Sequence, residues 1–356
     1  MKRILCLIDS LVAGGAQRQL VGLAAHLKIR GYIVKVITYH DIPFYLPYLK
    51  KNKVEYDNLQ CGKGLFQRLS IINKTIKRFS PDVVISFLDS PNILASLLKM
   101  GHRKWKLIVS ERNTTQQLNF REYLKFFLYR YADIIVPNSY SQEDFIKKYH
   151  PCLANKCQVI TNFVETDLFC PSEIKKTNNM TRIIGVGRIA NQKNIPILIE
   201  AVKLICDKGE NVRVDWYGNS FEAYDDCMCL INQYGLQAFF EFHKPYNPIV
   251  EKYNESDIFV LPSLYEGFPN VLCEAMSCGL ISIASDVCDN GRIIDNGITG
   301  FLFPSGDSQK LAKCIMKVIS MTTEQRVVMR NACRKFAIDK FSEEEFINKY
   351  ITLIEQ

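Results

Sequence analysis

Two glutamates in the C-terminal third of the chain, Glu266 and Glu274, bracket seven residues that follow a short apolar run at 258–261. Proline is well tolerated in the first turn of a helix, so a helix is predicted to begin near Pro269. Glu266 would then lie in the loop before this helix, and Glu274 about a turn and a half inside it. The amides of residues 268–271 would point outward at the positive helix end, which suits an anion. A carboxylate on each side of that anion could hold hydroxyl groups, which is the layout that a nucleotide-sugar needs.

Two cations follow another apolar run, at 183–186. Arg188 comes directly after Gly187, and Lys193 follows five residues later. Cations beside a crevice can neutralise charge on a diphosphate while its bond to a sugar breaks. The same pattern also fits two surface cations before a helix, so both interpretations stay open at this point.

A pair of glycines, Gly14 and Gly15, opens the first predicted helix of the chain. Backbone amides at such a position can approach a phosphate or a sugar closely. Paired glycines can also simply permit a tight turn. Their spacing is not GxGxxG, so it does not support a dinucleotide-binding fingerprint.

Polar residues follow two further strand-like runs of the first half. Asp89 comes after the run at 83–87, and the cluster from Ser110 to Asn113 comes after the run at 107–109. A polar group at the end of a strand could contact an acceptor or the transferred sugar, with Asp89, Arg112 and Asn113 as the candidates. The alternatives are a helix N-cap for Asp89 and a capping turn for the cluster.

Alternating strands and helices must position these residues. Continuous apolar runs separated by helix-periodic segments predict parallel sheets that are covered on both faces. The predicted strands are 4–8, 33–38, 83–87, 107–110 and 134–136, followed by 183–186, 212–217, 239–242, 258–261 and 281–284. Ligands of doubly wound sheets bind at the carboxyl ends of the strands, where the candidate residues fall. The polar stretch 171–181 is the predicted linker between a first domain at 1–170 and a second at 182–342.

The charge of the chain is unevenly distributed. Residues 1–170 contain 25 Lys and Arg against 13 Asp and Glu, a balance of +12, whereas the remainder contains 20 against 24, a balance of −4. A basic first half suggests an anionic partner. No nucleic-acid motif is present, and the aromatic and basic residues at 44–51 suit an anionic membrane surface. A solvated helix and loop is the alternative for that segment.

Cysteine and histidine spacing gives little support for a disulfide framework or a metal site. The thirteen cysteines form no CxxC pair, and the N-terminus leads into a strand-like run without a signal-peptide pattern. We therefore predict reduced thiols in a cytosolic protein, without a run long enough to span a bilayer. Histidines 26, 40, 102, 150 and 243 show no metal-ligand spacing. His243 follows a predicted strand and is either a loop residue or a neighbour of a nucleotide base.

Taken together, these motifs resemble the family 4 retaining glycosyltransferases of the GT-B fold, an α/β fold of two facing, doubly wound, Rossmann-like domains with an interdomain cleft. The resemblance rests on the order and spacing of several short motifs, namely Gly14-Gly15-Ala16, Asn138-Ser139, Asn162-Phe163-Val164 with Phe169 and Pro171, Gly187-Arg188 with Lys193, Glu266-Gly267-Phe268-Pro269-Asn270 to Glu274, and Gly297-Ile298-Thr299-Gly300. The strings 85–89 and 110–111 are similar to a bacterial subgroup that builds lipid-linked oligosaccharides, including N-acetylgalactosaminyltransferases.

The resemblance implies a role for each matching residue. Arg188 and Lys193 would hold the donor diphosphate, Glu266 the donor hexose and Glu274 the ribose. The remaining donor-binding positions would be Gly14, Gly15, Gly187, Gly267, Phe268, Pro269, Asn270 and Val271. The last helix, within 343–356, would pack back on the first domain.

The implied reaction moves a hexose or N-acetylhexosamine from a UDP-sugar to a lipid-linked glycan, with retained configuration and without a metal or cofactor. The enzyme would act in bacterial surface polysaccharide or oligosaccharide assembly. It would be cytoplasmic and peripheral to the inner face of the cell membrane.

One residue departs from the family pattern. Many relatives carry a histidine where this chain has Arg112. Arginine stays protonated and cannot serve as a base. We therefore favour same-face attack, in which the departing phosphate takes the acceptor proton. A nucleotide-sugar 2-epimerase and a non-catalytic nucleotide-sugar-binding scaffold are the alternative functions.

Overall fold

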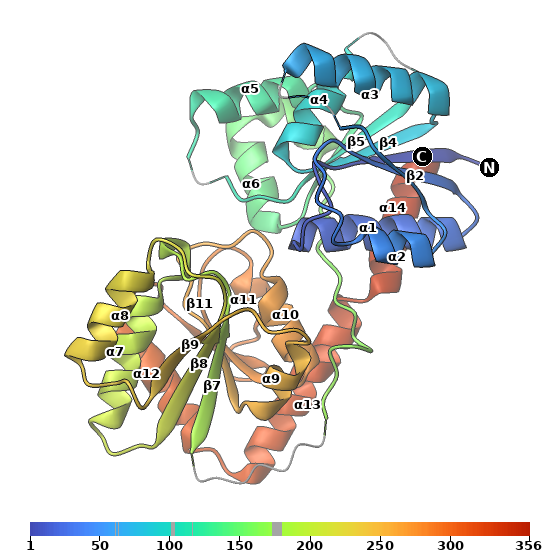
Figure 1. Cartoon of the computed structure of the whole chain (residues 1–356). Coiled ribbons are helices and arrows are strands. Elements are labelled where there is room, and N and C mark those ends of the chain that lie inside the picture. The colour runs from blue at the N-terminus through green and yellow to red at the C-terminus, as the bar shows by residue number, and fades with distance from the viewer. Residues whose placement is uncertain (61, 63, 101–103, 116, 173–179) are drawn as a thin grey trace. The chain divides into compact units, whose positions relative to one another are not determined.

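The computed structural model describes residues 1–60, 62, 64–100, 104–115, 117–172 and 180–356 (Figure 1). It divides into two compact units, one made of residues 1–163 and 344–356 and the other of residues 164–343. Each unit is built around a parallel sheet of six strands. The predicted fold class, α/β with two doubly wound sheets, is therefore confirmed.

The sheet of the first unit has the strand order β3-β2-β1-β4-β5-β6. Its strands are β1 (Arg3–Leu7), β2 (Ile33–Thr38), β3 (Glu55–Asn58), β4 (Val83–Phe87), β5 (Lys106–Glu111) and β6 (Ile134–Pro137). Its helices are α1 (Gly15–Ile29), α2 (Leu46–Lys51), α3 (Leu65–Phe79), α4 (Asp89–Lys99), α5 (Phe120–Tyr129), α6 (Tyr140–Tyr149), a 3₁₀ turn η1 (Pro151–Lys156) and α14 (Glu343–Glu355).

Alternation along β1 explains why this sheet is covered on both faces. Ile4 and Cys6 pack into one cluster with α1 and α14, whereas Leu5 and Leu7 pack into the opposite cluster with α3, α5 and α6. Successive side chains of a strand point to opposite faces, so an unbroken apolar run requires a helical layer on each side. Figure 1 shows these layers on the two sides of the first sheet.

The sheet of the second unit has the order β12-β11-β10-β7-β8-β9. Its strands are β7 (Thr181–Val186), β8 (Val212–Tyr217), β9 (Phe240–His243), β10 (Ile258–Leu261), β11 (Ile281–Ser285) and β12 (Gly300–Phe303). The connecting elements are a 3₁₀ turn η2 (Asn191–Lys193), α7 (Ile195–Cys206), α8 (Tyr224–Gln233), α9 (Val250–Glu255), α10 (Asn270–Ser277), α11 (Asn290–Ile293), α12 (Ser308–Ile319) and α13 (Thr323–Lys340).

The boundary between the units lies at residue 163, earlier than the expected end of the first domain at 170. The Val164 amide donates to the Phe341 carbonyl at 3.0 Å, and Phe169 lies in the core of the second unit. The Arg334 guanidinium donates to the carbonyl oxygens of Thr166 and Phe169. These contacts attach the segment after 163 to the second unit. Residues 173–179 of the expected linker lie outside the described residues.

The last helix, α14, completes the core of the first unit. Its apolar face, which includes Phe346, Tyr350 and Leu353, is buried in the cluster around α1. The ammonium groups of Lys2 and Lys106 donate to the carbonyl oxygens of Ile354 and Leu353, both at 2.6 Å. Cations at a helix C-terminus satisfy carbonyl groups that have no partner within the helix.

The absence of a side chain at Gly185 of β7 allows close packing against Trp216 of the neighbouring strand β8. A Cβ atom at this position would lie 2.1 Å from the ring of the fully buried Trp216. Gly185→Ala should therefore lower the free energy of unfolding by about 1–3 kcal/mol, the usual cost of overpacking a core. The control is Gly64→Ala, where the nearest atom would be 3.9 Å away. Denaturant titration followed by circular dichroism measures both, and equal losses would contradict the packing argument.

Candidate active site

Two loops of the second unit meet at the carboxyl edge of its sheet. One follows β7 and contains Arg188 and η2, and the other follows β10 and leads into α10. The Gln192 side chain donates to the Tyr265 carbonyl at 2.9 Å, and the Leu264 amide donates to the Gln192 carbonyl at 2.8 Å. The loops that follow the neighbouring strands β7 and β10 are therefore connected to each other by hydrogen bonds.

A buried ion pair joins Lys193 and Glu266, two of the three residues predicted to be catalytic, the third being Arg188. Lys193 Nζ lies 2.6 Å from Glu266 Oε1, and the Ser263 hydroxyl donates to the same oxygen at 2.6 Å. Both charged side chains are largely buried, with 12% and 8% of their surfaces exposed. Removing one partner of such a pair leaves an uncompensated buried charge. The sequence placed both residues at this edge but did not predict that they contact each other.

The backbone before Lys193 leaves room for its side chain. Gly187 has φ of +149°, and a Cβ atom there would lie 2.8 Å from Lys193 Cε. Arg188 extends from the next position and is exposed, with its guanidinium 5.1 Å from the centre of the Phe221 ring. A glycine before the arginine therefore lets both cations occupy the same edge of the sheet.

The helix predicted to begin near Pro269 is α10, whose first residue is Asn270. Glu274 lies inside this helix, is buried, and accepts from the Tyr253 hydroxyl at 3.3 Å. The expectation that all the amides of residues 268–271 point outward is wrong, because the Asn270 amide donates to the Phe268 carbonyl at 3.0 Å. The Phe268 ring is itself buried in the core of this unit.

A pocket of about 340 Å³ opens after β8 and β9. Its lining includes Gly218, Asn219, Ser220, Tyr224, His243 and Lys244. His243 is the last residue of β9, and its ring stacks on Tyr217 with 4.7 Å between the ring centres. Polar groups and aromatic faces lining one pocket can bind a planar heterocycle, so this edge could also accommodate the base of a nucleotide.

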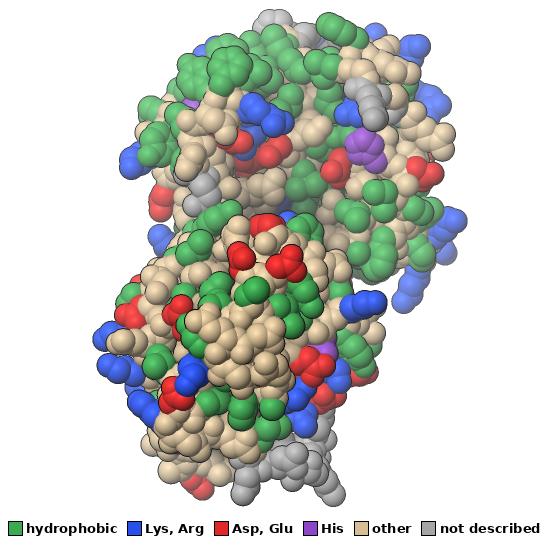
Figure 2. All heavy atoms as spheres, turned by 60° about the vertical axis from the view of Figure 1, so that its left-hand side comes forward, with side chains coloured by type: hydrophobic (Ala, Val, Ile, Leu, Met, Phe, Trp, Pro, Cys, Tyr) green, Lys and Arg blue, Asp and Glu red, His purple; other side chains and the backbone are tan. Residues whose placement is uncertain are grey.

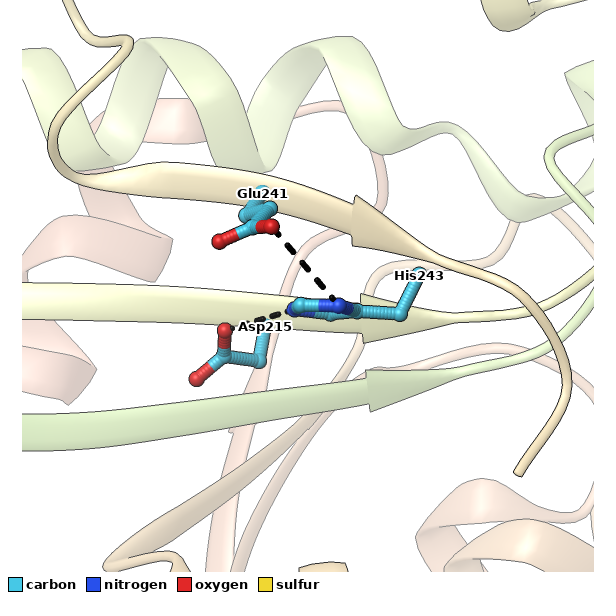
Figure 3. A group of neighbouring side chains, drawn as sticks. All are labelled: Asp215, Glu241 and His243. Atoms are coloured by element: carbon cyan, nitrogen blue, oxygen red, sulfur yellow. Dashed lines mark hydrogen bonds and ion pairs between the residues drawn. The ribbon is translucent and has the colours of Figure 1, made fainter.

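His243 also belongs to a group of potential metal ligands that spacing along the chain did not reveal. Among the described residues, Asp215, Glu241 and His243 place ligand atoms within 4.8 Å of one another, because β8 and β9 pair here (Figure 3). The ring lies 2.8 Å from Asp215 through Nε2 and 3.9 Å from Glu241 through Nδ1. Arg213 forms ion pairs with both carboxylates. Since the two ring nitrogens face different carboxylates, we interpret this group as an ion-pair network that orients His243.

In the first unit, the glycine pair lies where it was expected. Gly14 is the N-cap of α1 and Gly15 is its first residue, and neither is buried. The Gln17 side chain turns back over Gly14, close to where a Cβ atom would lie. The N-terminus of α1 therefore presents backbone amides without a side-chain cap.

Asp89 and Asn113 come together at the carboxyl edge of the first sheet. The Asn113 side chain donates to Asp89 at 3.2 Å, and Lys125 Nζ donates to the other Asp89 oxygen at 3.3 Å. The N-cap alternative for Asp89 is wrong, because Leu88 occupies the cap of α4 and no side chain caps it. The Asp89 carboxylate is partly exposed, with 38% of its side chain accessible. It could therefore contact a bound molecule.

Lys125 is a positioning residue that the sequence did not reveal. Its ammonium is buried and donates to Asp89, to Glu111 at 2.9 Å and to Glu122 at 2.6 Å. Burial raises the pKa of Glu111 to about 7, although Lys125 opposes this shift. The Tyr129 hydroxyl donates to the second Glu111 oxygen at 2.6 Å. A lysine in a helix is normally expected at the surface. The burial of Lys125 depends on Asp89 and Glu111, which lie 36 and 14 residues away in the sequence.

Arg112 is buried within the first unit. Its guanidinium donates to Asn162 at 2.6 Å and to the Tyr350 hydroxyl of α14 at 2.5 Å. It also lies 4.2 Å from the centre of the Phe87 ring. These contacts attach β5 to the last helix. Arg112 is therefore buried, whereas the Asp89 side chain is partly exposed and Asn113 is exposed.

Two family models match the chain in succession. Residues 13–168 match the model described as Glycosyltransferase Family 4, and residues 171–336 match the model described as Glycosyl transferases group 1. The first match falls almost entirely on the first unit, and the second falls on the unit with the Lys193–Glu266 pair.

Curated relatives carry glycosyltransferase names. The chain is 25% identical over 97% of both lengths to the GalNAc-alpha-(1->4)-GalNAc-alpha-(1->3)-diNAcBac-PP-undecaprenol alpha-1,4-N-acetyl-D-galactosaminyltransferase of Campylobacter jejuni. It is also 30% identical to the UDP-Gal:alpha-D-GlcNAc-diphosphoundecaprenol alpha-1,3-galactosyltransferase of Escherichia coli, over 52% of this chain and 51% of the relative.

Solved structures share the whole fold. The complex of Anabaena HepE with UDP and glucose superposes with a TM-score of 0.87 at 19% identity, covering 100% of both chains. A glycosyltransferase from Rickettsia africae superposes with a TM-score of 0.87 at 20% identity, covering 99% of this chain and 98% of the other. This architecture is the GT-B fold. The chain belongs to the glycosyltransferases in which a family 4 domain is followed by a group 1 domain.

Proposed function

We propose that the protein transfers a hexose or N-acetylhexosamine from a UDP-sugar to a lipid-linked glycan, with retained configuration. The reaction would serve bacterial surface polysaccharide or oligosaccharide assembly. The names of the Campylobacter and Escherichia relatives support a diphosphoundecaprenol-linked acceptor. The name of the Escherichia relative and the UDP complexes of HepE support a UDP-linked donor.

The observation that carries this proposal is the buried Lys193–Glu266 pair beside exposed Arg188. A lysine ammonium has three N–H donors, so donation to Glu266 does not by itself exhaust Lys193. Lys193 and Arg188 would hold the donor diphosphate, while Glu266 contacts the hexose. Glu274, further along α10, would accept from the ribose hydroxyls. The backbone around Gly187 and Gly267 would approach the donor closely.

The proposed chemistry depends on positioning and electrostatics. The bond between the sugar C1 and the diphosphate oxygen breaks, and a bond from the acceptor oxygen to C1 forms on the same face. The acceptor proton passes to the departing phosphate oxygen, so the protein need not supply a base. Preorganised cations stabilise the developing phosphate charge, which is commonly the largest catalytic contribution.

The first unit would bind the acceptor through the partly exposed Asp89 and Asn113. For Arg112 we propose a structural role, because its guanidinium is buried and two of its nitrogens donate to Asn162 and Tyr350. The amides at Gly14 and Gly15 would approach the donor diphosphate. We place the enzyme in the cytoplasm at the inner membrane face. None of the helices in the described part of the chain combines the length and apolar character needed to cross a membrane.

The ion pair can be tested with a double-mutant cycle. Lys193→Ala and Glu266→Ala should each lower kcat by about 10²-fold or more, as for other preorganised polar contacts. Because the two side chains touch, the double variant should lose much less than the product of the two single losses. Lys252 and Glu255 form a matched lysine–glutamate pair on α9 at 2.9 Å, and their alanine variants should keep normal rates. Normal turnover in both single variants of the Lys193 pair would place the donor elsewhere.

A panel of nucleotide-sugars tests the donor. UDP-sugars should raise the melting temperature and undergo slow hydrolysis, whereas the corresponding GDP-sugars should do neither. A ligand that binds only the native state stabilises it by a free energy that grows with the logarithm of its concentration relative to Kd, so shifts measured at equal concentration rank the donors. Product analysis by NMR reports the anomeric configuration. Conversion of UDP-N-acetylglucosamine to its 2-epimer without acceptor would support an epimerase instead.

Asp89→Asn tests the acceptor side. This variant should raise KM for the acceptor by about tenfold or more, since a charged hydrogen-bond acceptor contributes roughly 1.5–3 kcal/mol. Donor hydrolysis should stay unchanged. Glu122→Gln is the matched control, because it also removes one carboxylate from Lys125 but is not proposed to contact the acceptor. Equal effects of the two variants on acceptor KM would show that the loss acts through Lys125 rather than through Asp89.

A further inference from the structure

Helix α5 is apolar on the side that faces solvent. Phe120, Tyr123, Leu124 and Phe127 have exposed fractions of 80%, 56%, 47% and 43%. Their spacing of i, i+3, i+4 and i+7 places them on one stripe of the helix. In Figure 2, which turns the left-hand side of Figure 1 toward the viewer, hydrophobic side chains gather on the upper part of the first unit.

The fold itself does not need this stripe. The opposite side of α5 supplies the core contacts, through Phe126, Leu128 and Tyr129. A helix at the surface of a soluble protein normally carries polar residues on its outer side. Contiguous exposed apolar side chains commonly mark a binding surface for a protein or a membrane.

The charges around the stripe indicate which partner it fits. Arg121 and Arg130 are exposed near the two ends of α5, and the Arg130 guanidinium lies 4.4 Å from the centre of the Phe127 ring. The acidic residue of the helix, Glu122, is turned to the buried Lys125. The stripe is therefore flanked by cations within a strongly basic half of the chain.

We propose that α5 docks the first unit on an anionic lipid bilayer. The docking surface consists of Phe120, Tyr123, Leu124 and Phe127 with Arg121 and Arg130. The rings would enter the headgroup boundary and the guanidinium groups would contact lipid phosphates, as in amphipathic helices that lie in the plane of a membrane. The idea that the membrane supplies the acceptor rests on the proposed function. The exposed stripe and its flanking charges are features of the structure and do not depend on that function.

The segment 44–51, which the sequence suggested for a membrane, is less suited to this role. Leu49 is buried, and Tyr45, Leu46 and Tyr48 pack against the core of the first unit. Phe44 is exposed, but most aromatic surface of this segment is used to hold α2 on the sheet. The exposed apolar stripe of α5 therefore replaces it as the docking surface.

Vesicle sedimentation tests the proposal with the full chain. The wild type should bind phosphatidylglycerol-containing vesicles much more strongly than phosphatidylcholine vesicles. Its binding to the anionic vesicles should weaken as the salt concentration rises. Phe120→Ser combined with Phe127→Ser should reduce partitioning about tenfold or more. Arg121→Gln and Arg130→Gln should each reduce it about fivefold, the usual contribution of one basic residue near an anionic surface.

Phe66→Ser is the matched control, because Phe66 lies on α3 of the same unit and is 85% exposed. It should leave partitioning unchanged. Equal losses for Phe66→Ser and the α5 variants would overturn the assignment to α5, and so would wild-type binding that ignores lipid charge. Absence of vesicle binding together with concentration-dependent dimerisation abolished by the α5 variants would identify a second copy of the chain as the occupant instead.

Slow hydrolysis of the UDP-sugar in solution separates this proposal from the proposed function. The α5 variants should hydrolyse the donor at the wild-type rate while losing transfer to acceptor embedded in vesicles. If the wild type hydrolyses no UDP-sugar but still binds anionic vesicles through α5, the proposed function fails and the docking surface stands. If the wild type hydrolyses the UDP-sugar but does not bind vesicles, the docking surface fails and the proposed function stands.

Discussion

The ion pair between Lys193 and Glu266 is the contact on which the candidate site depends. It joins the loops after β7 and β10, which are otherwise connected through Gln192. In a largely buried setting, either charge without the other would be costly, so the two loops must keep their relative positions. A ligand that reaches this edge would meet a preformed arrangement of charge rather than mobile side chains. This preorganisation is what electrostatic catalysis of group transfer requires.

The sequence was sufficient to locate these loops but not to orient their side chains. Buried strands with unbroken apolar runs, such as β1 and β10, identified a doubly wound architecture, and that architecture places functional groups after strands. Lys193 and Glu266 are separated by 73 residues, and their contact depends on the neighbouring positions of β7 and β10 in the sheet. Spacing along the chain indicates where a residue lies relative to its own strand. It does not indicate which side chain of a neighbouring loop that residue contacts. The edge strand β3 was missed for a related reason, since its sequence is polar and lacks a buried run.

Two buried cations of the first unit show the same limit of sequence reasoning. Lysine and arginine are exposed by default, so Lys125 gave no signal and Arg112 was expected to meet a substrate. The structure instead surrounds Lys125 with three carboxylates and places Arg112 between Asn162 and Tyr350. Apart from Glu122, which lies on α5 with Lys125, their partners come from other parts of the chain. Tertiary neighbours decided the location of both side chains.

The return of α14 to the first unit has a consequence for synthesis of the chain. Phe346, Tyr350 and Leu353 of α14 cover one face of a sheet whose six strands all precede the second unit along the chain. The whole second unit is made in between, which takes roughly ten to forty seconds at ordinary elongation rates. Throughout that interval the apolar side chains of α1 and β1 that pack on α14 in the folded chain would lack this cover. A chaperone that binds exposed apolar segments would therefore recognise the first unit before the second unit is complete.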